Sequence, residues 1–479
     1  MSAQPPPTFA IVGAGFSGMA VAVQLLQGLQ GPARVCLINR SLSFGRGMAY
    51  GTNSPSHLLN VPAGRMSIDP AQESGFIDYV RSRGLNLRAG DFVPRSLYGD
   101  YLERCLLRAQ SAAADGVKLE LVEAEVLRID MDSDGGSPVL HLSTGRTIEA
   151  AQVILALGNF TPRAPATQSP ANWTQAPLVN DVWSHGVLDE LDADASVLLV
   201  GTGLTAYDAV LRLLDQGHRG AITMLSRRAL LPQPHREQET PPAAGLVPAD
   251  VLQGVTSLRA QLREVRRLIR DSAAAGHDWR DVIGGLRSHT PRLWQQLDER
   301  SRAQFVRHLG PYWDTHRHRA APAIYRRIQA ALNSGQLSVL QGRLVDVTST
   351  DGPGEADKQR ARVTWRPRGA TDNRTGDYRV VINCTGPSSD LHRVSDPLIA
   401  QLRDAGALSV DPLALGLSVD EQYRVLKRDS SALQRVRYVG PLLKAQHWEA
   451  TAVPELRVHA KNVAACVLKS ETAALDVRA

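Results

Sequence analysis

TFAIVGAGFSGMAVAVQLLQ, residues 8–27, contains an apolar strand, a glycine turn and a helix of small residues. Gly13, Gly15 and Gly18 form a GxGxxG pattern. The first glycine permits a tight turn, the second lets backbone approach a pyrophosphate, and the third lets the helix pack on the strand. The helix N-terminus, beginning near Ser17, then offers free N–H groups to phosphate. A second apolar strand at 35–38 completes the βαβ unit. We therefore predict a dinucleotide site here, rather than a purely structural glycine turn.

The residue that should hold the adenosine ribose departs from the usual pattern. An acidic side chain is expected after the second strand, and Asn39 stands there, 26 residues after Gly13, followed by Arg40. An amide still hydrogen-bonds a hydroxyl, so Asn39 and Arg40 are predicted to contact the nucleotide without the expected negative charge.

A second unit begins at VLLVGTGLTAYDAVLRLL, residues 197–214. Gly201, Gly203 and Ala206 form GxGxxA around Thr205. The following strand ends in Ser226, Arg227 and Arg228, and Arg227 stands 26 residues after Gly201. Two guanidinium groups at this position suit a 2′-phosphate, so we predict NADPH rather than NADH. The alternative is a solvated basic strand end.

The same accessory pattern follows each unit. Short strands in 126–158 and again in 337–386 suggest β-meanders that end in an apolar strand and a glycine, Gly158 and Gly386. The fold class predicted is α/β, with two Rossmann-like dinucleotide-binding domains, β-meanders and a helical insertion. The FAD domain is expected to be discontinuous, 1–165 and 335–479, and the NADPH domain to cover 166–334, including helices in 249–333.

Composition narrows the functional class. The chain has 479 residues, 43% hydrophobic, with 54 basic against 48 acidic residues and a net charge of +6. This mild, dispersed excess does not favour nucleic-acid binding. No apolar run approaches the roughly 20 residues that span a bilayer, and the N-terminal segment lacks the pattern of a signal peptide, so a cytoplasmic location is expected. Oligomeric state is left open.

Residues with metal-binding or thiol chemistry are sparse. The four cysteines lie far apart, with no CxxC pair. Between 310 and 322 the sequence GPYWDTHRHRAAP gathers His316, Arg317, His318 and Arg319, of which His316, Arg317 and Arg319 are the candidate substrate contacts. Alternating arginines would repel a cation, so no metal site is predicted. Two interpretations of this cluster stay open: one faces a carboxylate-bearing substrate, and the other faces water or carboxylate partners within the protein.

Several longer motifs carry a resemblance to a known family. The segments are FGRGMAYGTNSPSHLLNVPAGRMS (44–67), FVPRSLYGDYL (92–102), LSRRALLPQPH (225–235), YWDTHRHRAAP (312–322) and GPLLKAQHWEATAVPELR (440–457). Together they resemble the bacterial FAD/NAD(P)-binding protein family, related to the N-hydroxylating flavin monooxygenases and including the nitrosuccinate-forming aspartate N-hydroxylases. The resemblance covers almost the whole chain and is specific for family membership, but not for substrate.

The resemblance implies further contacts. The segment 45–67 would wrap the FAD, and Pro454 fits the first turn of a helix whose N-terminus is aimed at the flavin. The cofactor contacts predicted from pattern and resemblance together are Gly13, Gly15, Ser17, Gly18, Asn39, Arg40, Gly47, Asn60, Arg65, Met66, Gly158, Gly201, Gly203, Thr205, Ala206, Ser226, Arg227, Arg228, Gly386, Gly440, Trp448, Ala452 and Val453.

These observations favour an NADPH-dependent FAD oxidoreductase. A flavin monooxygenase that uses O₂ to hydroxylate a small amine or amino acid is the leading hypothesis, and no catalytic side chain is assigned because the cofactors carry the bond-making chemistry. Two alternatives remain: a reductase of a quinone or small acceptor without oxygen insertion, and a flavin-binding sensor or interaction protein.

Overall fold

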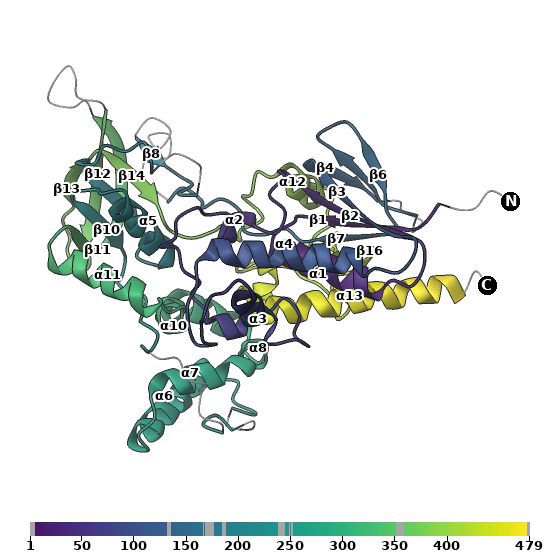
Figure 1. Ribbon diagram of the computed structural model, residues 1–479. Helices are drawn as coiled ribbons and strands as arrows, with labels where there is room; N and C mark the ends of the chain where they lie inside the picture. Colours follow the sequence, from purple (N-terminus) through teal and green to yellow (C-terminus); the bar gives the residue numbers. More distant parts are fainter. Residues whose placement is uncertain are drawn as a thin grey trace.

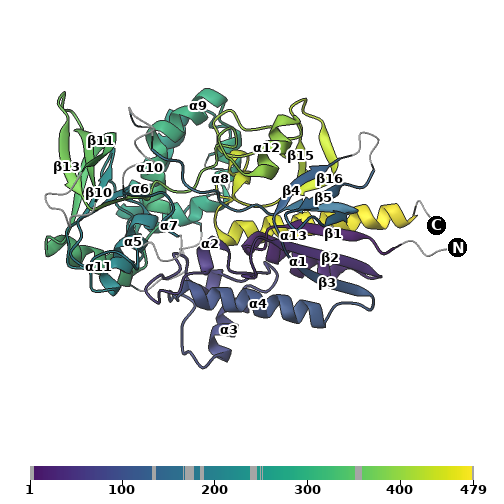
Figure 2. The same ribbon diagram turned by 90° about the horizontal axis from the view of Figure 1, so that it is seen from above.

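The computed structural model describes residues 5–131, 136–165, 167, 177–183, 188–237, 245–248, 250, 252–350 and 359–476. Two lobes, each built on one sheet, lie at opposite ends of the molecule, with helices between and below them (Figures 1 and 2). Residues 166 and 249, where the sequence places the start of the second domain and of its insertion, fall outside the described residues.

The first lobe is a six-stranded sheet in the order β15-β16-β7-β1-β2-β3. Neighbouring strands from β16 to β3 pair in parallel, and β15 is antiparallel to β16. Its strands are β1 (Thr8–Val12), β2 (Ala33–Asn39), β3 (Val117–Glu123), β7 (Gln152–Leu155), β15 (Arg424–Leu426) and β16 (Ala432–Tyr438). The central strand β1 is fully buried, which explains its continuous apolar sequence.

Different layers cover the two faces of this sheet. Alternate residues of β1 separate them: Phe9 and Ile11 face helices α1 (Phe16–Gly28), α4 (Arg95–Ser111) and α13 (Val453–Asp476), whereas Ala10 and Val12 face the opposite core. That second core includes α12 (Pro397–Asp404) and the meander of β4 (Val126–Asp130), β5 (Val139–Leu142) and β6 (Thr147–Glu149). The meander predicted after the first unit is therefore present.

The second lobe is a seven-stranded sheet in the order β13-β12-β11-β10-β9-β14-β8. Its strands are β8 (Leu178–Val179), β9 (Val197–Val200), β10 (Ile222–Ser226), β11 (Leu337–Thr350), β12 (Arg360–Pro367), β13 (Arg374–Tyr378) and β14 (Val380–Asn383). Helices α5 (Leu204–Asp215) and α11 (Pro322–Asn333) pack on one face in a shared core. Both glycine turns therefore begin a βαβ unit at the centre of a parallel sheet, as predicted.

The return of the chain to the first lobe comes later than the sequence suggested. Residues 337–341 of β11 pair in parallel with β10, and residues 342–350 of the same strand continue as the first strand of the antiparallel meander with β12. Strand β14 then pairs with β9. The segment 337–383 thus belongs to the second sheet, and the boundary predicted at 335 is wrong, because a single long strand joins the parallel sheet to its meander.

The helical insertion lies between the lobes and projects below them (Figure 1). It contains α6 (Leu258–Ala274), α7 (Trp279–Gly285), α8 (Thr290–Gln295), α9 (Glu299–Gln304) and α10 (Gly310–Arg317). The smaller helices of the first lobe are α2 (Gly47–Tyr50) and α3 (Gly75–Ser82). Trp294 and Leu297 of the insertion pack with Trp448 of the C-terminal segment, so the insertion is attached to both halves of the chain. Among the described residues, none of these helices is long and apolar enough to cross a membrane.

Candidate functional site

The first glycine turn has the geometry that a dinucleotide requires. Gly13 adopts φ +104°, and a Cβ there would lie 2.6 Å from the carbonyl oxygen of Ala156. A Cβ on Gly18 would lie 1.9 Å from the carbonyl oxygen of Gly13, so the third glycine is needed for the helix to approach the turn. Gly15 differs, because its Cβ would meet nothing within 4 Å. The position that a Gly15 side chain would occupy lies in a cavity and not against other protein atoms.

That cavity holds about 370 Å³ and is bounded by the turn on one side. Residues predicted to contact the cofactor that line it are Gly13, Gly15, Ser17, Asn39, Arg40, Gly47 and Gly158. The far wall is formed by Pro441, Thr451 and Leu456. Because α13 begins at Val453, with Pro454 in its first turn, the N-terminal end of this helix borders the cavity as the sequence indicated.

Asn39 and Arg40 lie at the cavity edge but are engaged within the protein. The Asn39 carboxamide accepts a hydrogen bond from the Ala14 backbone N–H at 3.3 Å and donates one to the Ser41 carbonyl at 2.8 Å. Arg40 forms ion pairs with Glu125, at 3.2 Å, and with Asp396. The amide at position 39 therefore helps to hold the glycine turn itself.

The other predicted contacts in the first lobe lie outside the described lining of this cavity. Met66 is buried in the hydrophobic core, and the Asn60 carbonyl accepts a hydrogen bond from His235 of the second lobe at 3.1 Å. The Trp448 ring packs against the Trp294 ring, with the two ring centroids 4.6 Å apart. Gly440, Ala452 and Val453 are neighbours of the lining in sequence but do not form it, and Arg65 is distant from it in sequence. For these positions the predicted contact stays a prediction.

The second glycine turn repeats the first. Gly201 adopts φ +127°, and a Cβ there would lie 2.3 Å from the carbonyl oxygen of Cys384. A Cβ on Gly203 would meet nothing within 4 Å, and Ala206 is fully buried beneath the helix start that includes Thr205. Gly386 follows β14 with φ +90° and open space around its Cβ position. The second turn thus offers the same backbone cradle for a pyrophosphate.

The residues at the end of β10 differ in how they are engaged within the protein. The Ser226 hydroxyl lies 3.0 Å from the Thr202 hydroxyl and accepts a hydrogen bond from the Ala229 backbone N–H at 3.0 Å. Arg228 donates to the Arg307 carbonyl at 2.8 Å. Arg227 is exposed and has no ion-pair or hydrogen-bond partner among the described residues. One guanidinium is therefore free beside the turn.

Within the basic cluster of the insertion, the Arg317 side chain is nearly buried and faces a carboxylate of the protein. Arg317 lies 2.8 Å from the Glu449 carboxylate, and the two side chains are only 10% and 2% exposed. Glu449 also accepts a hydrogen bond from the Trp313 indole N–H at 3.1 Å. The Arg317 Nη2 atom is buried without a hydrogen-bond partner among the described residues. Burial lowers the pKa of Arg317, and Glu449 counteracts that shift.

The other members of the cluster surround this pair. His316 donates a hydrogen bond from Nδ1 to the Tyr312 carbonyl oxygen at 2.8 Å and packs edge-on against Trp279. The Arg319 guanidinium lies 6.0 Å from the centroid of the Trp279 ring. Burial, together with nearby Arg317 and Lys444, lowers the pKa of His318 to about 3. His318 is therefore neutral near pH 7, and the positive charge of this region resides on its arginines and Lys444.

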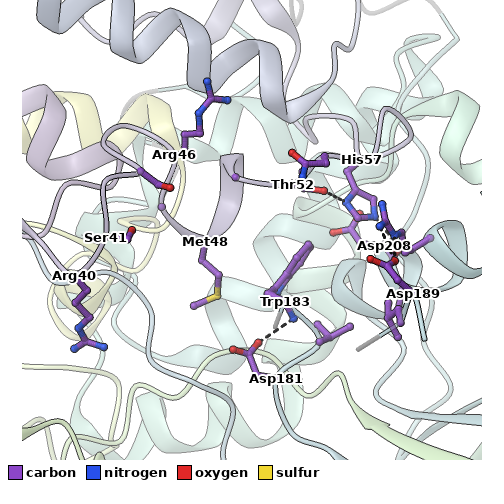
Figure 3. Close-up of a pocket in the computed structure, with 18 of the residues that line it drawn as sticks. Arg40, Ser41, Arg46, Met48, Thr52, His57, Asp181, Trp183, Asp189 and Asp208 are labelled. Atoms are coloured by element: carbon purple, nitrogen blue, oxygen red, sulfur yellow. Dashed lines mark hydrogen bonds and ion pairs between the residues drawn. The ribbon is translucent and has the colours of Figure 1, made fainter. Parts of the chain in front are cut away.

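A larger cavity, of about 620 Å³, lies between the lobes (Figure 3). One wall is the segment that follows β2, including Arg46, Met48 and His57, and the other comes from α5 and residues 181–183 and 188–189. Sequence reasoning predicted Asn39, Arg40 and Gly47 of this lining as cofactor contacts but missed the wall that faces them. Asp181 and Trp183 stand in no recognisable motif, and only the meeting of distant segments brings them to one cavity.

The two lobes are joined beside this cavity by buried polar contacts. Arg95 of α4 forms an ion pair with Asp208 of α5 at 2.9 Å, and the side chains are 14% and 6% exposed. His57 contacts the Asp208 carbonyl through Nε2 at 3.0 Å and the Thr52 hydroxyl through Nδ1 at 2.6 Å. Burial lowers the pKa of His57 despite the neighbouring Asp208. The helix that begins at the second glycine turn is thus held directly by the first lobe.

Comparison with known proteins supports the fold and the first unit. Residues 10–160 match the FAD-NAD(P)-binding family model, which confirms a nucleotide-binding first unit of that kind. No curated protein matches the chain by sequence.

Solved structures match along almost the entire chain. An L-lysine 6-monooxygenase from Pseudomonas syringae is 15% identical with a TM-score of 0.64, covering 97% of this chain and 99% of that one. The ornithine N-hydroxylase of Kutzneria sp. 744 is 15% identical, with a TM-score of 0.62 and coverage of 98% and 100%. A bacillithiol disulfide reductase from Staphylococcus aureus is 12% identical, with a TM-score of 0.54 and coverage of 98% and 99%. The chain shares the fold of such two-domain flavoproteins.

Proposed function

We propose that this protein is an NADPH-dependent FAD oxidoreductase that hydroxylates a small amine or amino acid with O₂. The proposal rests on the presence of two glycine turns in one chain, each with free space at its second glycine, Gly15 or Gly203. The lobes that carry these turns are joined by the buried Arg95–Asp208 ion pair. The similarity in fold to lysine and ornithine hydroxylating enzymes supports the monooxygenase form of the proposal.

The residues present fit both cofactors. Gly15 leaves room for a pyrophosphate at the N-terminus of α1, and Gly203 does the same at α5. The N-terminus of α13, at the far wall of the first cavity, favours negative charge on a ring placed there. Arg227 would hold the 2′-phosphate of NADPH. When bound, FAD supplies hydride acceptance from NADPH and reaction with O₂.

Dithiol chemistry, a reductase alternative within the same fold, has little support from the cysteines. Burial and the neighbouring Glu120 raise the pKa of Cys36 to about 12, and burial raises that of Cys105 to about 11. Cys384 is also buried, with a raised pKa. Such thiols are poor nucleophiles at neutral pH.

The test is a screen of amino acids, diamines and polyamines with the FAD-loaded protein. We expect one class to stimulate NADPH oxidation, with O₂ consumed in step and one oxygen atom found in the product by mass spectrometry. NADPH oxidation that persists without O₂ when a quinone is supplied would instead establish a reductase. Oxidation at the background rate with every compound would favour a sensor or interaction protein.

The basic cluster enters the proposal as the binding site for a substrate carboxylate. Its support is the buried Arg317 Nη2, which has no acceptor among the described residues, with Arg319 and His316 nearby. Changing Arg317 and Arg319 to Gln should leave FAD content and flavin reduction by NADPH intact and lower substrate-stimulated turnover at least tenfold.

This experiment needs a matched control, because Arg317→Gln leaves Glu449 buried without its partner. Breaking a buried pair from one side costs about 3–5 kcal/mol. The Arg317→Gln/Glu449→Gln variant removes both charges and should recover most of that stability. If the double variant retains normal substrate dependence, the cluster has only a structural role.

A further inference from the structure

The 620 Å³ cavity between the lobes has a charge balance that can be followed residue by residue. Arg46 pairs with Asp100 at 2.7 Å and with Glu103 at 2.8 Å. Arg212 pairs with Asp189 at 2.6 Å. The ion pairs of Arg40 and Asp208, described above, account for two further lining charges. Five of the six lining residues with formal charge are therefore neutralised by the protein itself.

Asp181 is the exception. Its Oδ1 atom accepts a hydrogen bond from the Trp183 backbone N–H at 3.0 Å, and the carboxylate has no cationic partner in the described part of the chain. His57 does not balance it, because both ring nitrogens are engaged and burial lowers the histidine's pKa. Among the described residues, the cavity wall consequently carries one carboxylate without a cationic partner.

Apolar side chains lie next to this carboxylate in a lining that is otherwise mostly polar. Val182 and Leu188 are buried beside it, and Trp183 is half-buried in the lining, with the Arg95 guanidinium 5.7 Å from the centroid of its ring. Figure 3 shows Met48 pointing from the opposite wall into the space that Trp183 and Asp181 border. An ammonium group is attracted by a carboxylate and by an aromatic ring, and a short attached hydrocarbon would contact Met48, Val182 and Leu188.

We propose that this cavity is a binding site for a small organic ammonium ion, with Asp181 as the counter-charge and Trp183 as the aromatic contact. Its volume lies within the range of small-molecule pockets, and its position between domains is typical of such sites. The site shares Asn39, Arg40, Arg46, Gly47 and Met48 with the cavity at the first glycine turn, so a ligand at Asp181 would lie next to the nucleotide.

The cavity is distinct from the two expected phosphate sites. The lining includes neither Gly15 nor Gly203, and α5 contributes Asp208, Ala209 and Arg212, which lie beyond its first turn. The inference therefore holds whether or not the protein is a monooxygenase. The lining of the cavity indicates an organic ammonium ligand, and the binding of such a ligand can be measured without NADPH, O₂ or turnover.

The experiment titrates the FAD-loaded protein with n-hexylammonium and, separately, with hexan-1-ol, using ligand-observed NMR to obtain dissociation constants at low salt. The two probes match in length and differ in charge. We expect the ammonium ion to bind at least tenfold more tightly than the alcohol, because a charge-assisted hydrogen bond contributes that much or more.

Asp181→Asn is the decisive variant, since its amide oxygen still accepts the Trp183 N–H and preserves the turn. Binding of hexylammonium should weaken about tenfold, with hexanol unaffected. Asp192→Asn is the matched control: Asp192 accepts the Asp194 backbone N–H at 2.8 Å in the same way but does not line the cavity. Trp183→Leu should weaken ammonium binding a few-fold.

Unaltered FAD content in each variant shows that the fold survives. Equal binding of hexylammonium to the wild-type protein and to Asp181→Asn would overturn the proposal. Equal binding of the alcohol and the ammonium ion to the wild-type protein would do the same, because the site would then recognise hydrocarbon alone.

Discussion

The two glycine turns of this molecule have nearly the same backbone and different neighbours. In both, the first glycine has a positive φ and lies against a carbonyl, and the second opens into free space. In the first lobe the Asn39 side chain bonds to the turn at Ala14, whereas in the second Ser226 contacts Thr202 by hydroxyl groups. The two lobes thus share the backbone geometry of the glycine turn, but they differ in the residues at the end of the next strand, β2 or β10.

The arginine that follows each of these strand ends, Arg40 or Arg227, also differs between the lobes. Arg40 is neutralised by Glu125 and Asp396, whereas Arg227 is exposed with no partner in the described ranges. A paired guanidinium has little to offer a phosphate, and a free one is available for it. The glycines predict where a dinucleotide binds, and we propose that the ion pairing of the following arginine decides which lobe favours a 2′-phosphate.

The largest expected effect comes from filling the open glycine positions. Gly15→Val should abolish FAD binding, and Gly203→Val should preserve FAD while abolishing flavin reduction by NADPH. Both positions have negative φ and free space, so valine fits the protein but occupies the pyrophosphate site. Absorbance of the purified proteins and stopped-flow reduction measure the two outcomes.

Gly13→Ala separates nucleotide loss from misfolding. Its φ is positive, and the added Cβ would collide with the Ala156 carbonyl, so this variant should lose thermal stability as well as FAD. Gly15→Val and Gly203→Val should melt near the wild-type apoprotein. If Gly203→Val lost FAD and Gly15→Val did not, the assignment of the two lobes would have to be exchanged.

A smaller effect is expected from the arginines that distinguish the lobes. Arg227→Ala/Arg228→Ala should raise the KM for NADPH tenfold or more and leave that for NADH nearly unchanged, because each lost charge-assisted bond contributes about 1.5–3 kcal/mol. Arg40→Ala, on the paired arginine of the first lobe, should not alter the NADPH to NADH ratio. Equal losses for both cofactors in the double variant would contradict the 2′-phosphate role.

Local patterns predicted much of this architecture because the relevant physics is local. The glycine spacing fixes turns and helix starts, and β1, α1, β9 and α5 lie where the sequence placed them. The position of α13 was also predictable, since Pro454 marks a first helical turn. In each case a few adjacent residues decide the outcome.

The sequence was less informative where distant segments meet. The sheet to which β11–β14 belong depends on pairing with β10 and β9, which no local pattern encodes. Arg317 meets Glu449 across 132 positions, so its buried pairing could not be inferred from the His-Arg repeat. The interlobe cavity and the Arg95–Asp208 pair arise in the same way, from packing of whole lobes.

The smallest effect concerns the amide at the first strand end. Asn39→Asp keeps an oxygen that accepts the Ala14 N–H hydrogen bond. It replaces the amide that donates to the Ser41 carbonyl with a second carboxylate oxygen, so a 2.8 Å hydrogen bond is lost and two acceptor oxygens face each other. One lost hydrogen bond of about 1 kcal/mol should weaken FAD binding roughly fivefold, as measured by titration of the apoprotein. Ser226→Ala, which disturbs the corresponding contact in the second lobe, should leave FAD affinity unchanged. If Asn39→Asp instead tightened FAD binding, a hydrogen bond from the ribose to the new carboxylate would outweigh the contact of residue 39 with the turn. The ends of β2 and β10 would then differ in how they recognise the ligand and not in how each supports its glycine turn.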